Sequence, residues 1–159
     1  MSVRRATAAD SAAAAAVVQT VFAEHGFTWD AGGYHLDLED VEAAFDDFWV
    51  EERGGRIVGC VGIRSEPLLL VGSDCSLERL YVLPETRGHG VGSALLTAAI
   101  AGARARGYAR MEIWSDKLLV DAHRLYERHG ARLVSERVND DPDASPEWGL
   151  VLDLAGRSD

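Results

Sequence analysis

The chain has 159 residues, 47% of them hydrophobic, which suits one packed domain and excludes a disordered acidic chain. Sixteen Lys and Arg against 26 Asp and Glu give a net charge of −10, which excludes general binding to a nucleic-acid backbone. Cys60 and Cys75 form no disulfide framework or CxxC motif, and no apolar run approaches the roughly 20 residues of a membrane span. We therefore expect a cytoplasmic protein with no membrane or nucleic-acid partner.

The charge is unevenly distributed along the chain. Between Thr28 and Glu52 nine residues are acidic and none is Lys or Arg, whereas nine basic residues accompany five acidic ones between Arg79 and Arg132. Two solvated faces would explain this pattern. A site for an anionic ligand beside a site for a cationic ligand would explain it as well.

The first part of the chain predicts a strand, a helix and a loop. A strand over Val3–Ala6 leads into a helix over Ala12–Glu24, which ends at Gly26, a typical C-cap residue. Residues 26–47 are polar, acidic and aromatic, which indicates a loop and a short helix.

Three predicted strands follow this loop. Phe48–Glu52 and Arg56–Arg64 are strand-like runs joined at Gly54-Gly55, which is typical of a β-hairpin. Leu77–Leu83 is a further strand, closed by Pro84.

The second half alternates helices with strands. In chain order it predicts a helix from about Gly92 to Arg106, the strand Met111–Trp114, the helix Val120–His129 and the strands Leu133–Val138 and Trp148–Leu154. An acidic loop, 139–147, joins the last two strands. The complete order is β-α-α-β-β-β-α-β-α-β-β, without a repeat or a linker. We therefore expect residues 1–159 to form a single domain of the α/β (α+β) class.

A glycine-rich loop, 86–92, joins the strand at Leu77–Leu83 to the helix that follows it. A helix N-terminus offers unpaired N–H groups to a phosphate, glycine lets the ligand approach, and Arg87 adds a cation. The loop lacks the Lys of a P-loop. A dinucleotide site is one alternative, because Glu112 lies about twenty residues on, where a ribose-binding acid is expected. A turn that binds no ligand is another.

Residues 78–96 closely resemble the acetyl-CoA-binding motif of the GNAT superfamily of acyl-CoA N-acyltransferases, which is a strand, Val-x-Pro and then Arg/Gln-x-x-Gly-x-Gly/Ala. Arg87, Gly90 and Gly92 match that last pattern. Residues 122–130 resemble the family's next motif, Ala-x-x-Leu-Tyr-x-x-x-Gly-Phe, although Ala131 replaces the Phe. The resemblance implies a GNAT-like domain with a central, mixed, mostly antiparallel sheet flanked by helices.

The resemblance also implies acetyl-CoA as the co-substrate. Backbone groups of Tyr81 and Val82 would contact the pantetheine arm, and the glycine-rich loop would hold the pyrophosphate. The implied coenzyme-binding residues are Leu80, Tyr81, Val82, Arg87, Gly88, His89, Gly90, Val91, Gly92, Ser93 and Tyr126. Many members carry an Asn where this chain has Leu119, so one side-chain contact to the coenzyme is not expected.

The implied reaction is transfer of an acetyl group to a primary amine by direct attack, through a tetrahedral intermediate. The amine must lose a proton, the oxyanion needs a donor such as the N–H of Val82, and the thiolate needs a proton. Tyr126 is the candidate acid, and a core tyrosine with a hydrogen-bonded hydroxyl is its alternative. Glu78 is the candidate base, because many relatives place a Glu at the position of Ser76 and the two positions share a strand face. A surface glutamate is the alternative there.

Fewer sequence features point to the residues that bind the amine acceptor. Trp29, Tyr34 and Trp148 are candidates for its pocket, with core packing as the alternative for each, and the acidic stretch 28–52 is expected to form a wall. A small cationic amine is therefore the expected acceptor. No metal is expected, since His123 and His129 do not share a helix face. A non-catalytic acyl-CoA-binding sensor or regulatory module remains the alternative function, and a homodimer, common in the family, remains open.

Overall fold

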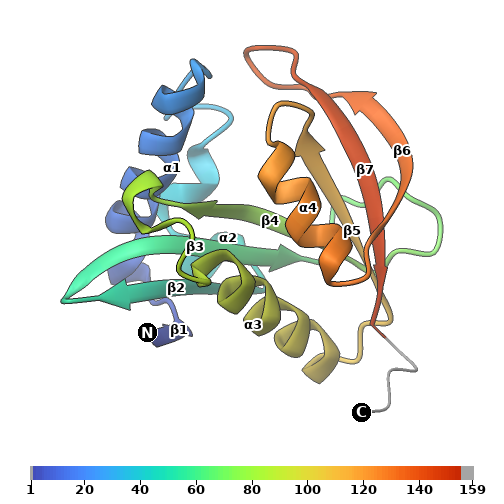
Figure 1. The fold of residues 1–159 in the computed structure, drawn as a ribbon, viewed down its shortest axis with the longest axis horizontal. Helices are drawn as coiled ribbons and strands as arrows, with labels where there is room; N and C mark the ends of the chain where they lie inside the picture. Colours follow the sequence, from blue (N-terminus) through green and yellow to red (C-terminus); the bar gives the residue numbers. More distant parts are fainter. Residues whose placement is uncertain (1, 155–159) are drawn as a thin grey trace.

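Seven strands form one sheet in the computed structural model, which describes residues 2–154 (Figure 1). The strands are β1 (Ser2–Arg5), β2 (Asp47–Arg53), β3 (Arg56–Arg64), β4 (Cys75–Val82), β5 (Arg110–Asp116), β6 (Arg132–Val138) and β7 (Pro146–Asp153). The helices are α1 (Ser11–His25), α2 (Val41–Ala44), α3 (Val91–Ala105) and α4 (Val120–Arg128), with 3₁₀ turns at Ala8–Asp10, Leu36–Glu39 and Pro84–Thr86. The strand order is β1-β2-β3-β4-β5-β7-β6.

The predicted element order and fold class are confirmed. All neighbouring strands are antiparallel except β4 and β5, which are parallel. Gly26 ends α1 with a φ of 71°, and Gly54 and Gly55 both have positive φ, as a tight hairpin turn requires.

Two strands, β4 and β7, begin two residues earlier than their sequence pattern predicts. β4 begins at Cys75 because Ser76 pairs with Arg64 of β3, and β7 begins at Pro146 because this residue pairs with Val138 of β6. The pairing partner extends each strand into residues whose own composition is typical of a turn.

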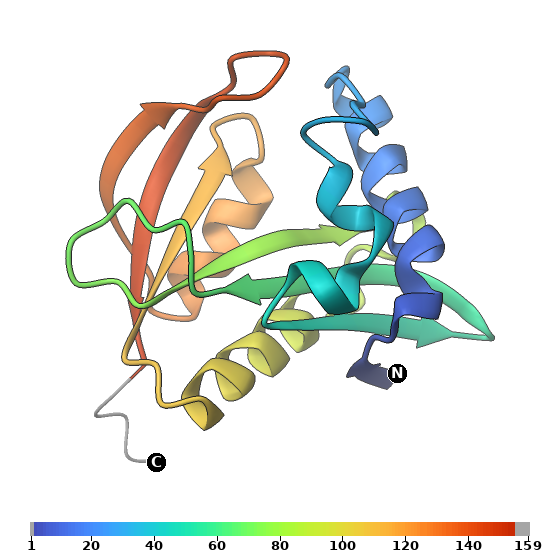
Figure 2. The ribbon, with the colours of Figure 1, turned by 180° about the vertical axis from the view of Figure 1, so that it is seen from behind.

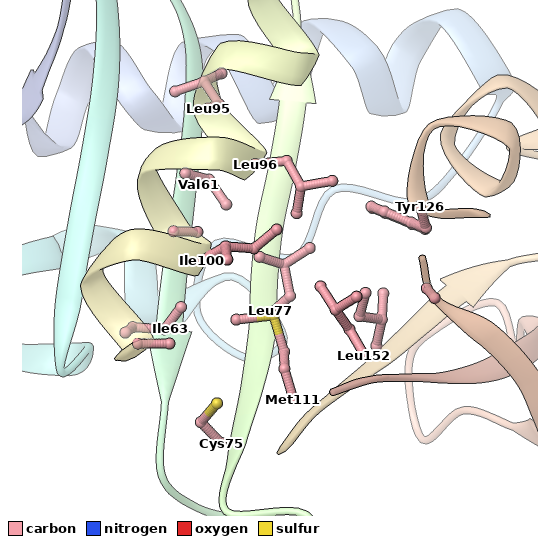
Figure 3. Packing of buried hydrophobic residues seen from close by; sticks show 14 of the residues in the cluster. Val61, Ile63, Cys75, Leu77, Leu95, Leu96, Ile100, Met111, Tyr126 and Leu152 are labelled. Carbon is pink, nitrogen blue, oxygen red and sulfur yellow. The ribbon is translucent and has the colours of Figure 1, made fainter. Parts of the chain in front are cut away.

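Helices cover both faces of the sheet. α3 and α4 lie on one face (Figure 1), and α1 and α2 lie on the other (Figure 2). Successive side chains of β2 point to opposite faces of the sheet. Trp49 packs with the cluster of buried residues under α3, whereas Phe48 and Val50 pack with the cluster under α1. Figure 3 shows the first cluster, where Leu96 and Ile100 of α3 lie over the sheet. None of the helices within residues 2–154 has the length and apolarity to cross a bilayer.

The sheet divides between β4 and β5. These strands pair only over Cys75–Leu77 and Met111–Ile113, and beyond that point they diverge (Figure 1). The register of β4 against β3 shifts at the same place, where Arg79 adopts a φ of 53°. This bulge bends β4 away from β5, so the backbone of residues 78–82 that faces β5 has no strand partner.

Candidate active site

A pocket opens where β4 and β5 diverge. Its walls come from these two strands, from α1 and α4, from the loop between α1 and α2 and from the loop between β6 and β7. The predicted catalytic residues Glu78 and Tyr126 both line it, together with the predicted coenzyme contacts Leu80 and Tyr81. The fold therefore brings together residues from segments that are far apart in the sequence.

Tyr126 projects from α4 into the edge of the core. It is 5% exposed, and Figure 3 shows its ring pointing toward Leu96 of α3. Within residues 2–154 no hydrogen bond reaches its hydroxyl, so this residue is not a hydrogen-bonded core tyrosine. Burial raises the pKa of Tyr126 above its usual range, which keeps the phenol protonated at neutral pH.

Glu78 lies in the pocket wall rather than on the outer surface of β4. The hydroxyl of Ser76 donates a hydrogen bond of 2.9 Å to its Oε1, which confirms that the two residues share a strand face. Burial raises the pKa of Glu78, and the nearby Arg64 guanidinium and the Ser76 hydrogen bond partly oppose this. A carboxylate with a raised pKa is a stronger base than a solvated one.

Arg79, at the bulge of β4, fixes the loop between α1 and α2. Its side chain is 8% exposed, and its Nη2 donates to the carbonyl of Tyr34 at 2.6 Å. Its Nε donates to Asp37 at 3.3 Å, and the same carboxylate accepts from Arg64 at 2.7 Å. The guanidinium also lies 4.5 Å from the ring centroid of Tyr34, so the aromatic wall of the pocket is held against β4.

The loop between β6 and β7 joins the loop between α1 and α2 across the pocket. The carboxylate of Asp143 accepts from the backbone N–H of Thr28 at 2.7 Å and from its hydroxyl at 2.6 Å. The amide of Asn139 donates to the hydroxyl of Tyr34 at 3.1 Å. These two contacts lie on the side of the pocket away from α3 (Figure 1), which we call the acceptor side because the acceptor is expected there.

The acidic wall of the pocket differs from the one predicted. None of the nine acidic residues between positions 28 and 52, all within the described chain, lines the pocket, so that expectation is wrong. Some of them have other contacts instead: Asp47 pairs with Arg5 and Arg106, and Asp40 caps α2 by accepting from the N–H of Ala43. The acidic residues that line the pocket are Glu78, Asp116, Asp141, Asp143 and Glu147.

Glu147 is the main residue that the sequence analysis missed. It is 7% exposed, its Oε1 accepts from the Nε of Arg137 at 2.8 Å, and burial raises its pKa. The acidic composition of residues 139–147 was its only signal, and composition does not distinguish a pocket residue from a solvated one.

Only one of the three predicted aromatic residues lines the pocket. Tyr34 does so. Trp29 stacks on His35 with ring centroids 4.1 Å apart, and Trp148 lies under the ammonium group of Lys117 at 3.9 Å. For these two tryptophans, packing was the correct alternative.

The glycine-rich loop forms an open cradle at the start of α3. Gly88 and Gly90 have φ of 81° and 78°, and a Cβ at either would have no neighbour within 4 Å, so a ligand can approach the backbone here. The N–H of Ala94 is the first to bond back to Gly90, so those of residues 91–93 have no helical partner. This backbone fits a pyrophosphate.

The side chains around the cradle are already engaged with neighbouring elements. Arg87 donates to Glu24 of α1 at 2.6 and 2.8 Å and to the carbonyl of Val82 at 3.2 Å. The hydroxyl of Ser93 lies 3.1 Å from Nε2 of His129, the C-cap residue of α4, and His89 is exposed. Backbone N–H groups, rather than these side chains, are therefore the main groups that the cradle offers to an anion.

Glu112 does not have the role that a dinucleotide site requires. It is 1% exposed, and its carboxylate accepts from the N–H groups of Leu69 and Leu70 and from the indole of Trp114 at 2.9 Å. It ties down the loop between β3 and β4 and cannot meet a ribose, so the dinucleotide alternative is wrong.

Comparison with known proteins agrees with this geometry. Residues 14–131 match the sequence model of the acetyltransferase (GNAT) family. The uncharacterized N-acetyltransferase YjgM of Escherichia coli (strain K12) is 36% identical over 134 residues, which cover 80% of this chain and 79% of that protein. The chain spans half or less of the length of several other curated relatives.

Solved structures of the same fold cover the whole described chain. A GNAT-family acetyltransferase of Staphylococcus aureus Mu50 superposes with a TM-score of 0.79 at 17% identity, over 96% of this chain and 98% of that one. The structure of yncA from Salmonella typhimurium, solved with acetyl-CoA, has a TM-score of 0.75 at 20% identity, over 100% and 96% of the two chains. The chain therefore belongs to the GNAT family and is an acyltransferase that uses acetyl-CoA.

Proposed function

We propose that the protein transfers the acetyl group of acetyl-CoA directly to a primary amine of a small cationic molecule. The observation that carries this proposal is the composition of the pocket. A protonated phenol and a carboxylate of raised pKa line it, and its charged residues are five carboxylates and one guanidinium, that of Arg79. A negative wall of this kind attracts a cationic amine.

The cradle and the open edge of β4 support the proposed coenzyme site. Acetyl-CoA supplies the acetyl group as a thioester. The backbone N–H groups of residues 88–93 would bind its pyrophosphate, and the edge at Leu80–Val82 would bind its pantetheine arm as an added strand does. This edge is available because β4 pairs with β5 only up to Leu77.

The N–H of Val82 is the proposed donor to the oxyanion. The N–H of Leu83 donates to Val58 of β3 at 2.8 Å, so the N–H of Val82, the neighbouring residue, points to the opposite, open edge. The carbonyl of Val82 accepts from Arg87 on that same side. A fixed backbone donor aimed at developing charge lowers the barrier without reorganisation.

Glu78 and Tyr126 would perform the two proton transfers. Glu78 takes the proton from the ammonium form of the acceptor, because its raised pKa brings it closer to that of the amine. Tyr126 gives its proton to the leaving thiolate, because burial keeps its phenol protonated. Leu119 lies beside them in the pocket wall and adds no charge.

A thiol-release assay with a panel of amines tests this function. We expect free thiol from acetyl-CoA only when an amine is present, with the highest kcat/KM for cationic amines. The control is acetyl-CoA with enzyme alone, which reports hydrolysis. Thermal stabilisation by acetyl-CoA without turnover of any amine would contradict the proposal and would support a non-catalytic acyl-CoA sensor.

A further inference from the structure

Two buried carboxylates face each other at the acceptor end of the pocket. Glu147 of β7 lies directly opposite Asp116 of β5 in the register of the sheet, so both side chains are on one face. Glu147 is 7% exposed and Asp116 is 8% exposed, and both line the pocket. Like charges directly opposite each other destabilise a sheet unless a cation lies between them.

A single guanidinium neutralises only part of the negative charge of this pair. Arg137 donates from Nε to Oε1 of Glu147 at 2.8 Å, and its guanidinium lies 4.4 Å from the ring centroid of Trp114, which fixes its position. No group within residues 2–154 donates a hydrogen bond to the second oxygen, Oε2, of Glu147. The nearby Lys117 is engaged with Trp148 and Glu136. One negative charge of the pair therefore faces the pocket without a cation.

The two carboxylates of the loop between β6 and β7 that line the pocket are already used. Asp141 accepts from the N–H groups of Asp143 and Ser145 and from the amide of Asn139. Asp143 binds Thr28 through both of its oxygens. These two residues shape the loop, and Glu147 keeps an oxygen available to a ligand.

We propose that Glu147, with Asp116 beside it, binds a second ammonium group of the acceptor, so that the preferred substrate is a diamine or a longer polyamine. This inference rests on the proposed function, because Glu78, which lines the same pocket, receives the proton of the reacting amine. Glu147 is a specificity-determining residue, and it takes no part in the proton transfers.

The test compares diamines with amino alcohols of the same chain length, which lack only the second charge. We expect putrescine and cadaverine to have a lower KM than the matching amino alcohols. Glu147→Gln raises the KM of the diamines by about 10- to 100-fold, the range of a lost hydrogen bond to a charged group. It leaves the KM of the amino alcohols and the kcat of both nearly unchanged.

Glu136→Gln is the matched control. This carboxylate lies on the neighbouring strand β6, its side chain is 66% exposed, and it pairs with Lys117 away from the pocket. We expect it to change neither KM. Equal KM values for diamine and amino alcohol in the wild type, or an equal rise of both in Glu147→Gln, would overturn the inference.

A second variant separates ligand binding from a structural role of the ion pair between Glu147 and Arg137. Arg137→Gln removes the competing cation, so we expect the KM of putrescine to stay the same or to fall. If Glu147 only holds β6 against β7, both variants lower the midpoint of thermal unfolding and raise KM together, which overturns the inference. Arg137→Gln also keeps the test available if Glu147→Gln does not fold.

Failure of the proposed function has a different signature, because no amine then releases thiol. In that case calorimetry of putrescine binding tests Glu147 directly. An affinity about 10- to 100-fold weaker in Glu147→Gln than in the wild type supports the site, and equal affinities overturn it.

Discussion

At the scale of single residues, Glu78 and Tyr126 approach the pocket from opposite faces of β4. Leu77 and Leu80 pack in the same cluster as Tyr126, under α3 and α4, whereas Glu78 follows Leu77 and points to the other face. An amine that enters from the side of α1 meets the proposed base, and the thiol that leaves toward α4 meets the proposed acid. The two proposed proton transfers would therefore take place on different sides of β4.

Tyr126→Phe tests the proposed acid. We expect kcat to fall by about 10²- to 10⁴-fold, the usual contribution of general acid catalysis. The midpoint of thermal unfolding should hardly change, because no hydrogen bond within residues 2–154 is lost. Thiol release and thermal unfolding measure the two effects.

Tyr108→Phe is the matched control for this variant. The hydroxyl of Tyr108 donates to Asp46 at 2.8 Å, far from the pocket wall, so its loss should lower stability and leave turnover intact. Unchanged turnover in Tyr126→Phe would remove Tyr126 from the acid role.

The raised pKa of Glu78 predicts the shape of the pH–rate profile. A base acts only when it is deprotonated, so kcat should fall as the pH drops through the pKa of Glu78. Burial is the main cause of the shift, so the midpoint should lie above the ordinary Glu value of about 4.3. In Glu78→Gln this acid limb should disappear and kcat should be low throughout. The same midpoint in the variant would assign the titration to another group.

At the scale of elements, α3 is placed by a close approach to β2. A Cβ added to Gly102 would lie 2.4 Å from the ring of Trp49, so the helix packs against the sheet at a distance that only glycine permits at this position. The N-terminus of the same helix carries the glycine-rich cradle, which is the proposed site of the pyrophosphate. The packing of Gly102 against Trp49 therefore helps to position the proposed binding site at the other end of α3.

Gly102→Ala tests this packing. We expect a loss of about 1–3 kcal/mol of stability from overpacking, and a higher KM for acetyl-CoA because α3 must shift. Thermal unfolding and initial rates measure these effects. Ala101→Ser, at the neighbouring exposed position, should change neither. Full stability of Gly102→Ala would show that Trp49 moves aside without cost.

At the scale of the whole molecule, the acidic residues behind the net charge of −10 have two different roles. The acidic residues of the N-terminal half form ion pairs and a helix cap, as with Asp47 and Asp40. The pocket gathers its own carboxylates from β4, β5, β7 and the loop before β7. The negative electrostatic field at the pocket mouth therefore exists only once the fold has brought these carboxylates together.

The ionic-strength dependence of the rate tests this field. Raising the salt from about 0.01 M to 0.1 M shortens the Debye length from about 30 Å to about 10 Å. We expect kcat/KM to fall with salt for a cationic acceptor, and more steeply for a doubly charged one. Initial rates for putrescine and its matching amino alcohol measure this. Rates that are indifferent to salt would mean that the pocket carboxylates do not attract the acceptor.

The fold and the position of the glycine-rich loop could be predicted from the sequence because their signals are local. Each of three motifs can be recognised from a few consecutive residues: the glycines near Arg87, the strand end Val82-Leu83-Pro84 and the helix with the pattern Ala-x-x-Leu-Tyr. The element order follows from hydrophobic periodicity and turn residues. The acceptor side is different. Glu78 and Glu147 line one pocket although they belong to strands β4 and β7, which are far apart in the chain.

Pairing between strands that are distant in the sequence brings these residues together. The residues next to them in the chain carry no pattern that predicts this pairing. Asp116 and Glu147 face each other because β5 pairs with β7, whereas Asp47 of the stretch 28–52 pairs with Arg5 and Arg106 of distant segments. The sequence alone was enough to predict the family, the fold and the position of the cradle, since backbone conformation and helix ends are coded locally. The assembled fold settled which carboxylates face the pocket, because burial and charge pairing depend on contacts between strands that are distant in sequence.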